Sequence, residues 1–519
     1  MNILSDSKFI TAGIACAAGS VIAETRPNLL VFLTDDQRAD TLGCYNSMCP
    51  IQTPNIDRLA ANGIRFDNAF VTTPICMVSR ASILTGRYNC NTRLYQFRTP
   101  LPDDAFAESY PVHLKKAGYF TGAFGKYGVG VTPAVLETFD VFDGQAVQGP
   151  EFREYLGRTM HDAEWLTVKA GEFFEQIPSD RPFCLQLNYK EPHPTSVPDP
   201  VDDHLLDSHF FDRVPTDTPA DFASLPEYVR KGYGRENYET DFNKDGDHNP
   251  FMRQYHEKIV SVDRSVGEVM NMLREKGLLN NTVVVFLSDH GTHFGEKQLG
   301  GKWTPYDASL HIPFIIVDPR AKVSGGTVCD EFVLNIDIAP TLLDLAGVAV
   351  PPVMDGLSLS PLLHGKSGFS RDCFFYEHYT SPAPIKYIPR NAGLRSKSEK
   401  YVRWIDTDPV SEEFYDLSAD PLERNNLINN ESYCERIEQV RRRFDEWREK
   451  NPSTYRYDQY GERPQSGAPE IDWEKFRQVR PEEYERIKTE IERLGVTWEQ
   501  AMNDWEVRYE ICSNAEYWY

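Results

Sequence analysis

The sequence lacks an excess of basic residues, and beyond its first 23 residues it lacks a long apolar run. Of its 519 residues, 55 are Lys or Arg and 78 are Asp or Glu, so the formal net charge is −23. This charge opposes contact with nucleic acids and with anionic membranes, and we expect neither as a partner. Because no later stretch reaches about 18 uninterrupted apolar residues, we expect no membrane-spanning helix in the mature chain.

The N-terminus has the pattern of a secretory signal. Lys8 precedes a weakly apolar run over 9–23 that ends in Val21-Ile22-Ala23. We therefore expect a signal peptide over 1–23 and a periplasmic or secreted protein. Residues 13–16 (Gly-Ile-Ala-Cys) permit a lipoprotein anchor as an alternative, but they lack the usual leucine. A cytoplasmic protein without any signal is the other alternative.

Length and cysteine content set further limits. A chain of 519 residues predicts two domains, and 40% apolar with 26% charged residues is typical of globular proteins. In an exported protein, the cysteines other than Cys16 and Cys76 could form disulfides, and Cys44 lies close enough to Cys49 to close a small loop. Cys184 lies in an apolar run, so we expect it to be packed in the core.

Apolar runs alternate with helical patterns through most of the chain. The expected strands are 28–34, 119–124, 183–188 and 282–287, and the expected helices between them include 113–118, 167–177 and 254–276. Continuous apolar runs of this kind are typical of parallel strands buried on both faces. The alternation predicts an α/β fold with a mostly parallel central sheet flanked by helices. Unusual polar residues follow the strands, where such sheets bind their ligands.

Changes in this pattern suggest the domain boundaries. We expect an N-terminal α/β catalytic domain over 24–365, with a polar insertion rich in Pro and Asp at about 195–250. Short strand patterns predict a smaller C-terminal α+β domain with an antiparallel sheet over 366–430. A charged helical extension follows over 431–519.

The segment 76–87 (Cys-Met-Val-Ser-Arg-Ala-Ser-Ile-Leu-Thr-Gly-Arg) predicts a short helix with a reactive start. Residues 72–74 (Thr-Thr-Pro) are helix N-terminal signals, and Gly86 can end the helix. Cys76 would then lie at the positive end of the helix dipole, and Arg80 one turn later could bind the same anion. A buried cysteine on an ordinary helix is the alternative for the first five residues alone.

Carboxylates after two expected strands predict a cation site. Asp35 and Asp36 follow the strand at 28–34, and Asp289 follows the strand at 282–287 with His290 beside it. Hard divalent cations bind several oxygen ligands, mostly carboxylates. Considered separately, each pair could instead be a helix cap or a polar turn.

Together these motifs resemble the formylglycine-dependent sulfatases of the alkaline-phosphatase-like superfamily. That family has the signature C-x-(P or A)-S-R followed by L-T-G-R, in which the cysteine is oxidised to formylglycine. The other motifs that carry the resemblance are, in order, Thr34-Asp35-Asp36, Thr53-Pro54-Asn55-Ile56-Asp57-Arg58-Leu59-Ala60, Gly125-Lys126, Pro192-His193-Pro194, Ser288-Asp289-His290-Gly291, Gly301-Lys302-Trp303-Thr304, Phe414-Tyr415-Asp416-Leu417 and Asp420-Pro421.

The resemblance implies hydrolysis of a sulfate ester, which we place on a carbohydrate, and a formylglycine-generating enzyme as partner. Formylglycine at position 76 would be hydrated to a diol; one hydroxyl would attack sulfur and the other would later expel sulfate. The implied calcium ligands are Asp35, Asp36, modified Cys76, Asp289 and His290. The implied catalytic and substrate-binding residues are Arg80, Lys126 and Lys302, which would hold the sulfate, and His193, which would protonate the leaving oxygen.

Two positions depart from the family pattern. Val78 replaces Pro or Ala in the segment that the modifying enzyme recognises, and Gly128 occupies the place of the histidine in G-K-W-H-x-G. His293 and His311 are candidates to replace that histidine. These departures keep a non-catalytic protein that binds sulfated glycans as one alternative. A phosphate or phosphonate diester hydrolase of the same superfamily is the other.

Overall fold

A computed structural model describes most of the chain. The described residues are 26–95, 99–323, 325–366, 368–380, 388–407, 409–455, 462–463, 470–471, 474, 477–478, 481–498 and 501. The expected signal peptide over 1–23 lies outside them. Among the residues described, none of the helices combines the length and the apolar character needed to cross a membrane.

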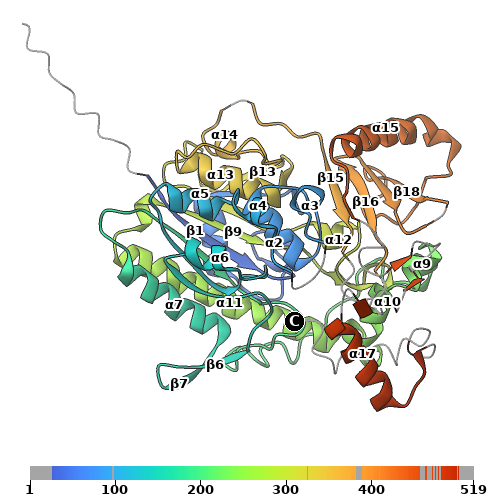
Figure 1. Cartoon of the computed structure of the whole chain (residues 1–519), viewed down its shortest axis with the longest axis horizontal. Helices are drawn as coiled ribbons and strands as arrows, with labels where there is room; N and C mark the ends of the chain where they lie inside the picture. The colour runs from blue at the N-terminus through green and yellow to red at the C-terminus, as the bar shows by residue number, and fades with distance from the viewer. Residues whose placement is uncertain are drawn as a thin grey trace, which may run out of the picture.

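An eight-stranded mixed sheet forms the centre of the N-terminal domain (Figure 1), with strand order β13-β2-β12-β9-β1-β8-β4-β5. The strands are β1 (Asn28–Thr34), β2 (Ile64–Phe66), β4 (Phe120–Lys126), β5 (Val141–Gln145), β8 (Phe183–Asn188), β9 (Thr282–Ser288), β12 (Phe314–Val317) and β13 (Thr327–Cys329). Strands β9, β1, β8, β4 and β5 run parallel, whereas β12 runs antiparallel to both of its neighbours. The prediction of a mostly parallel sheet is confirmed, with β12 as the exception.

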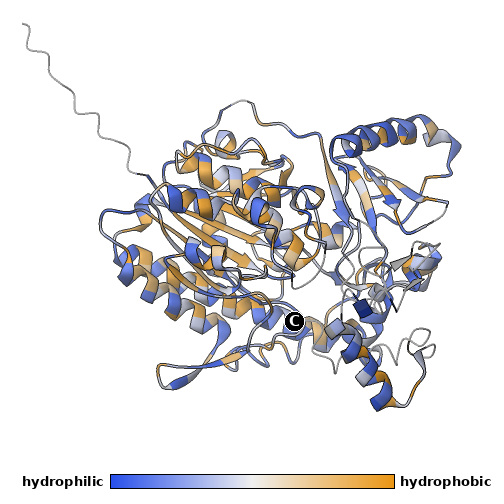
Figure 2. Cartoon of the chain, viewed as in Figure 1, coloured by the Kyte–Doolittle hydropathy of each residue, from blue (hydrophilic) through white to orange (hydrophobic). Residues whose placement is uncertain are grey.

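Helices cover both faces of this sheet. The helices on one face include α1 (Pro54–Asn62), α7 (Asp162–Gln176) and α11 (Asn249–Glu275), and those on the other include α2 (Cys76–Thr85), α5 (Tyr110–Lys116) and α13 (Ile338–Leu345). Alternate residues of β1 belong to the two opposite apolar clusters, because successive side chains of a strand point to opposite faces. Figure 2 shows the result as hydrophobic strands between helices that are polar on their outer sides.

A four-stranded antiparallel sheet forms the smaller C-terminal domain. Its strands are β15 (Cys373–His378), β16 (Asn391–Ser396), β17 (Glu399–Trp404) and β18 (Ser411–Asp416), and helix α15 (Cys434–Lys450) lies beside them (Figure 1). The rings of Phe375 and Trp447 stack with centroids 4.6 Å apart, which fixes α15 to this sheet. The predicted antiparallel C-terminal sheet is thereby confirmed.

The remaining α-helices and strands of the described residues are mostly short. They are β3 (Ala69–Phe70), α3 (Asn89–Thr92), α4 (Asp103–Phe106), α6 (Pro133–Thr138), β6 (Phe152–Tyr155), β7 (Arg158–His161), α8 (Pro219–Ala223), α9 (Glu227–Arg230), α10 (Tyr233–Asn237), β10 (His293–Phe294), β11 (Gly300–Gly301), α12 (Asp307–Leu310), β14 (Val333–Leu334), α14 (Ser360–Leu363), β19 (Glu462–Arg463), β20 (Glu470–Ile471) and α17 (Pro481–Leu494). The eight described cysteines are free, so Cys44 and Cys49 do not form a disulfide, and Cys184 is packed in the core on β8.

Candidate active site

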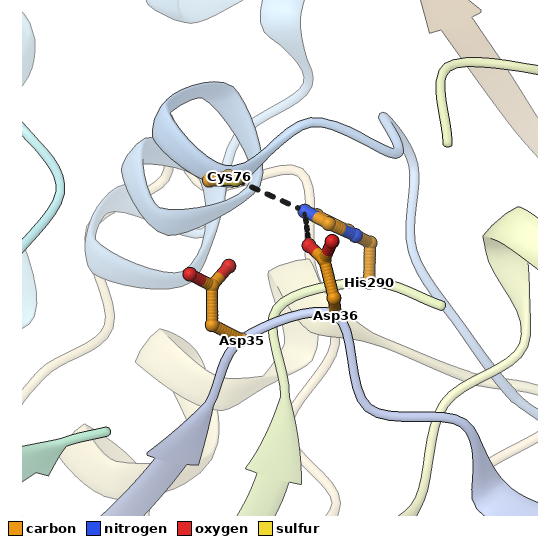
Figure 3. A group of neighbouring side chains, drawn as sticks. All are labelled: Asp35, Asp36, Cys76 and His290. Atoms are coloured by element: carbon orange, nitrogen blue, oxygen red, sulfur yellow. Dashed lines mark hydrogen bonds and ion pairs between the residues drawn. The ribbon is translucent and has the colours of Figure 1, made fainter. Parts of the chain in front are cut away.

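The predicted site residues converge at the carboxyl ends of the central strands, beside the N-terminus of α2. All of them are buried: Asp35, Asp36, Cys76, Arg80, Lys126, His193, Asp289, His290 and Lys302. Figure 3 shows the carboxylates of Asp35 and Asp36 directed toward Cys76 and His290. Residues separated by more than 200 positions in the chain thus form one polar cluster, because parallel strands deliver their ends to the same edge.

Cys76 is the first residue of α2. The helix begins after Ile75, which provides no side-chain cap, and it ends at Gly86 in the left-handed conformation with φ 66°. The predicted end is therefore confirmed, whereas the Thr-Thr-Pro segment at 72–74 precedes the helix without capping it. The Sγ atom of Cys76 accepts a hydrogen bond from Lys302 Nζ at 3.2 Å and lies 3.3 Å from His290 Nε2.

Hydrogen bonds donated by backbone N–H groups connect the two acidic strand ends. The N–H of Asp36 donates to Asp289 Oδ1 at 3.1 Å, and the N–H of Asp289 donates to the Thr34 carbonyl at 3.0 Å. Asp36 has a φ of 64°, a conformation that costs energy in a residue with a side chain. A strained residue held in place by the end of a neighbouring strand is typical of a functional site.

Each carboxylate of the cluster has a cationic partner. Lys126 donates to Asp35, Lys302 Nζ donates to Asp36 Oδ1 at 2.6 Å, and Arg80 Nε donates to Asp289 Oδ2 at 2.8 Å. Burial raises the pKa of Asp35, but the surrounding positive charges, Lys126 foremost, lower it well below the usual value.

The pKa of Lys302 is shifted in the opposite direction. Burial lowers this pKa, but the charge of Asp36 raises it more. Lys302 therefore stays charged, which suits it to bind an anion.

Two histidines face this cluster with different charges. Burial lowers the pKa of His290, but Asp289 and Asp36 raise it more, to about 9. Burial and the charge of Lys302 lower the pKa of His193 well below the usual histidine value. Thr195 contacts His193 Nδ1 through its hydroxyl at 2.8 Å and its backbone N–H at 3.3 Å. Because the N–H can only donate, Nδ1 accepts and the proton of the neutral ring lies on Nε2, which is 3.9 Å from Asp36 Oδ2.

The cluster has the donor atoms of a site for a hard cation. One ligand atom from each of Asp35, Asp36, Cys76 and His290 lies within 4.8 Å of the others. Asp289 borders this group, since its Oδ1 atom lies 3.5 Å from His290 Nε2. Asp35 Oδ1 is buried without a hydrogen-bond partner, so this oxygen is available as a ligand. Asp35 and Asp36 supply carboxylate oxygens and Asp289 a third beside them, which fits calcium, whereas His290, with its raised pKa, would have to lose its proton to coordinate the ion.

Sequence reasoning missed one residue of this site. Gln148, in the loop after β5, is buried, and its Nε2 donates to Asp35 Oδ2 at 3.1 Å. A glutamine in an irregular loop has no spacing that would reveal this contact, so only the three-dimensional structure identifies it.

Gly128 stands where the family pattern has a histidine, and the structure leaves no room for a side chain there. Gly128 has a φ of 75°, and a Cβ atom at this position would lie 2.3 Å from Cδ of Arg80. Arg80 therefore occupies the space that a side chain at 128 would need. His293 and His311 are hydrogen-bonded elsewhere, to Thr304 Oγ1 at 2.7 Å and to the Asp67 carbonyl at 2.9 Å.

We expect Gly128→Ala to lower kcat/KM by about 10²-fold, because Arg80 must move by an ångström or more to admit the methyl group. Gly118→Ala is the matched control, since Gly118 also has a positive φ (93°) but its Cβ would meet no atom within 4 Å. Both variants introduce backbone strain, but only Gly128→Ala displaces Arg80, so a difference in their activities reports this displacement. Equal activities in steady-state assays of the two variants would contradict the steric explanation.

Valine at position 78, where the family signature has Pro or Ala, is compatible with the packing of this fold. Val78 is fully buried and packs with Ile75, Tyr233, Trp303 and Ile388 in a small apolar cluster. A β-branched apolar side chain is well suited to this position. The valine therefore belongs to the core beneath the site, next to the residue that follows Lys302.

Comparisons with known proteins agree with one another. A family model described as Sulfatase matches residues 27–348, and a model described as N-sulphoglucosamine sulphohydrolase, C-terminal, matches residues 295–450. An N-acetylglucosamine-6-O-sulfatase of Bacteroides thetaiotaomicron is 27% identical over 496 residues, which covers 83% of this chain and 88% of that protein.

Solved structures share the fold. The structure of BT4656 in complex with its substrate D-glucosamine-2-N,6-O-disulfate has a TM-score of 0.71 and 26% identity, covering 83% of this chain and 99% of the other. A phosphonate monoester hydrolase of Agrobacterium radiobacter has a TM-score of 0.67 at 22% identity, covering 82% and 96%. This second likeness shows the fold alone.

Proposed function

The chain belongs to the sulfatase family and is a sulfuric ester hydrolase, and from this premise we propose that it cleaves sulfate from a carbohydrate with formylglycine made from Cys76 and with calcium. The observation that carries the proposal is the contact of Cys76 Sγ with Lys302 and His290 at the start of α2, inside a cluster of buried carboxylates and cations. A cysteine in such surroundings is placed for chemistry on an anion.

Three cations would bind the sulfate group. Arg80, Lys126 and Lys302 are each paired with a carboxylate, so their positions are fixed before the substrate arrives. Positive charges held in place in a buried site stabilise the negative charge that develops in the transition state. Arg80 also donates to the carbonyl of Lys126, which couples the two sulfate-binding side chains.

His193 would supply the proton for the leaving oxygen. Its Nε2 atom carries the proton in the neutral ring and faces Asp36, because the N–H of Thr195 occupies Nδ1. A sugar alkoxide is a poor leaving group, so the reaction depends on an acid positioned to protonate the leaving oxygen. The sulfate ester itself is anionic and would favour the protonated, positively charged imidazole.

Two groups complete the proposed chemistry. Asp35, Asp36, Asp289 and His290 would hold calcium, which supplies a Lewis acid beside residue 76. Formylglycine, produced from Cys76 by a formylglycine-generating enzyme, supplies a hydrated aldehyde as nucleophile. We further propose that the chain is exported, in agreement with the signal pattern over 1–23.

The substrate class is tested with a small panel. An aryl sulfate, an aryl phosphate diester, N-acetylglucosamine 6-sulfate and D-glucosamine-2-N,6-O-disulfate are assayed for sulfate or phosphate release; the two sugars follow from the relatives named above. We expect turnover of the aryl sulfate and of at least one sulfated sugar. Faster turnover of the phosphate diester than of any sulfate would support the diester hydrolase instead.

A further inference from the structure

A buried lysine lies behind the proposed general acid. Lys258, on α11, is 1% exposed, and its ammonium group donates to the carbonyl of His193 at 2.9 Å and to the carbonyl of Ser196 at 3.0 Å. No motif of the family resemblance includes this residue. Because burying an ammonium group is costly, its position requires compensation from the groups around it.

Acidic residues beside Lys258 provide this compensation. Glu191 is fully buried, and neither of its carboxylate oxygens has a hydrogen-bond partner. Burial raises the pKa of Glu191 to about 7, against the opposing charges of Lys190 and, more weakly, Lys258. Burial lowers the pKa of Lys258 to about 8, and the charge of Glu191 opposes this shift. The charge of Glu151 also favours the charged form of Lys258.

The same acids lie close to His161 and to a second buried lysine. Donor atoms of Glu151, His161 and Glu191 lie within 4.8 Å of one another. Lys190 Nζ lies 3.2 Å from Glu151 Oε1, and the electrostatic influence of Lys258 reaches Glu191. These acids therefore compensate the charges of the two buried lysines, Lys190 and Lys258.

The turn that Lys258 holds determines the orientation of the imidazole. Thr195 lies between the two carbonyls that accept from Lys258, and its N–H donates to His193 Nδ1. Ser196 adds two bonds to the His193 carbonyl, from its N–H at 3.0 Å and from its hydroxyl at 2.8 Å. The ammonium group thereby fixes both ends of the 193–196 turn, within which Thr195 contacts Nδ1 of His193.

We propose that Lys258 is a positioning residue for His193, which it holds through the carbonyls of residues 193 and 196. The inference rests on the proposed function, in which His193 protonates the leaving oxygen. Lys258 does not touch the substrate; it keeps Nε2 of His193 directed at the site. Its loss should therefore impair only those reactions that need a protonated leaving group.

The test compares two leaving groups in one enzyme. For Lys258→Met, we expect kcat on a sulfated sugar to fall by about 10²-fold, whereas kcat on 4-nitrophenyl sulfate, whose leaving group needs no proton, should change by less than about threefold. In a His193→Ala background, Lys258→Met should cause no further loss on the sugar, because both act through one proton transfer.

A matched variant controls for the loss of a buried ammonium group. Lys297 is 2% exposed, and its ammonium group donates to the carbonyl of Glu423. We expect Lys297→Met to leave the ratio of the two kcat values unchanged. Equal losses on both substrates in Lys258→Met would overturn the positioning role alone. Absence of sulfate release by the unmutated protein would overturn the proposed function as well.

Discussion

Cys76→Ala is expected to eliminate sulfate release, with a loss of kcat on the order of 10⁴-fold or more, because the variant has no residue that can supply the nucleophile. The thiol of Cys76 accepts from Lys302 and lies beside His290, and Cys76 belongs to none of the apolar clusters described above, so we expect its removal to leave the core intact. The measurement is sulfate release from a sulfated sugar, with thermal unfolding of the same sample as a check on folding.

Cys184→Ala is the matched control for this experiment. Cys184 is also a buried cysteine, but it lies on β8 in the apolar core and has no polar partner at the site. We expect this variant to lose some stability and to keep its activity. Retention of sulfate release by Cys76→Ala would contradict the proposed nucleophile. If the protein without substitutions binds the sulfated sugar but releases no sulfate, the result would support the non-catalytic alternative.

Arg80→Met is expected to have two large effects. The guanidinium group is 1% exposed, donates to Asp289 and lies 3.9 Å from Asp35, so its removal leaves two buried carboxylates without this partner. Breaking a buried ion pair in this way costs about 3–5 kcal/mol of stability. Activity should fall by about 10²–10³-fold as well, because a group that stabilises the transition-state charge is lost.

Arg371→Met separates these two effects. Arg371 forms a bidentate ion pair with Asp337, at 2.6 and 2.8 Å, which is also largely buried but does not involve the site carboxylates. We expect a comparable loss of stability in thermal unfolding and little change in kcat. A similar loss of activity in both variants would mean that Arg80 acts through stability alone.

The site residues that directly follow strands could be predicted from the sequence. The runs at 28–34 and 282–287 are buried along their whole length as β1 and β9, and their register pairs Thr34 with Ser288. This pairing brings Asp35, Asp36 and Asp289 to one edge, as predicted from the rule that parallel strands end together. Apolar periodicity is a strong signal because it reports burial directly.

The residues that support the site could not be predicted from the sequence. Lys258 lies on the buried stripe of α11 with Tyr255 and Val262, a position where periodicity predicts an apolar side chain. Its charge is tolerated because two carbonyls of a distant turn face it, and no local pattern encodes that turn. Gly128 shows the same limit, since its steric contact with Arg80 depends on how α2 packs against the end of β4.

The most direct test of the proposed chemistry is mass spectrometry of the peptide that contains residue 76, over Phe66–Arg80, in protein from its native host. Conversion of the cysteine thiol to the aldehyde of formylglycine lowers the mass by about 18 units. We expect the converted peptide, which would show that valine at position 78 is compatible with the modification. An unmodified thiol in active protein from that host would contradict the formylglycine mechanism, and an unmodified thiol in inactive protein would favour the glycan-binding alternative.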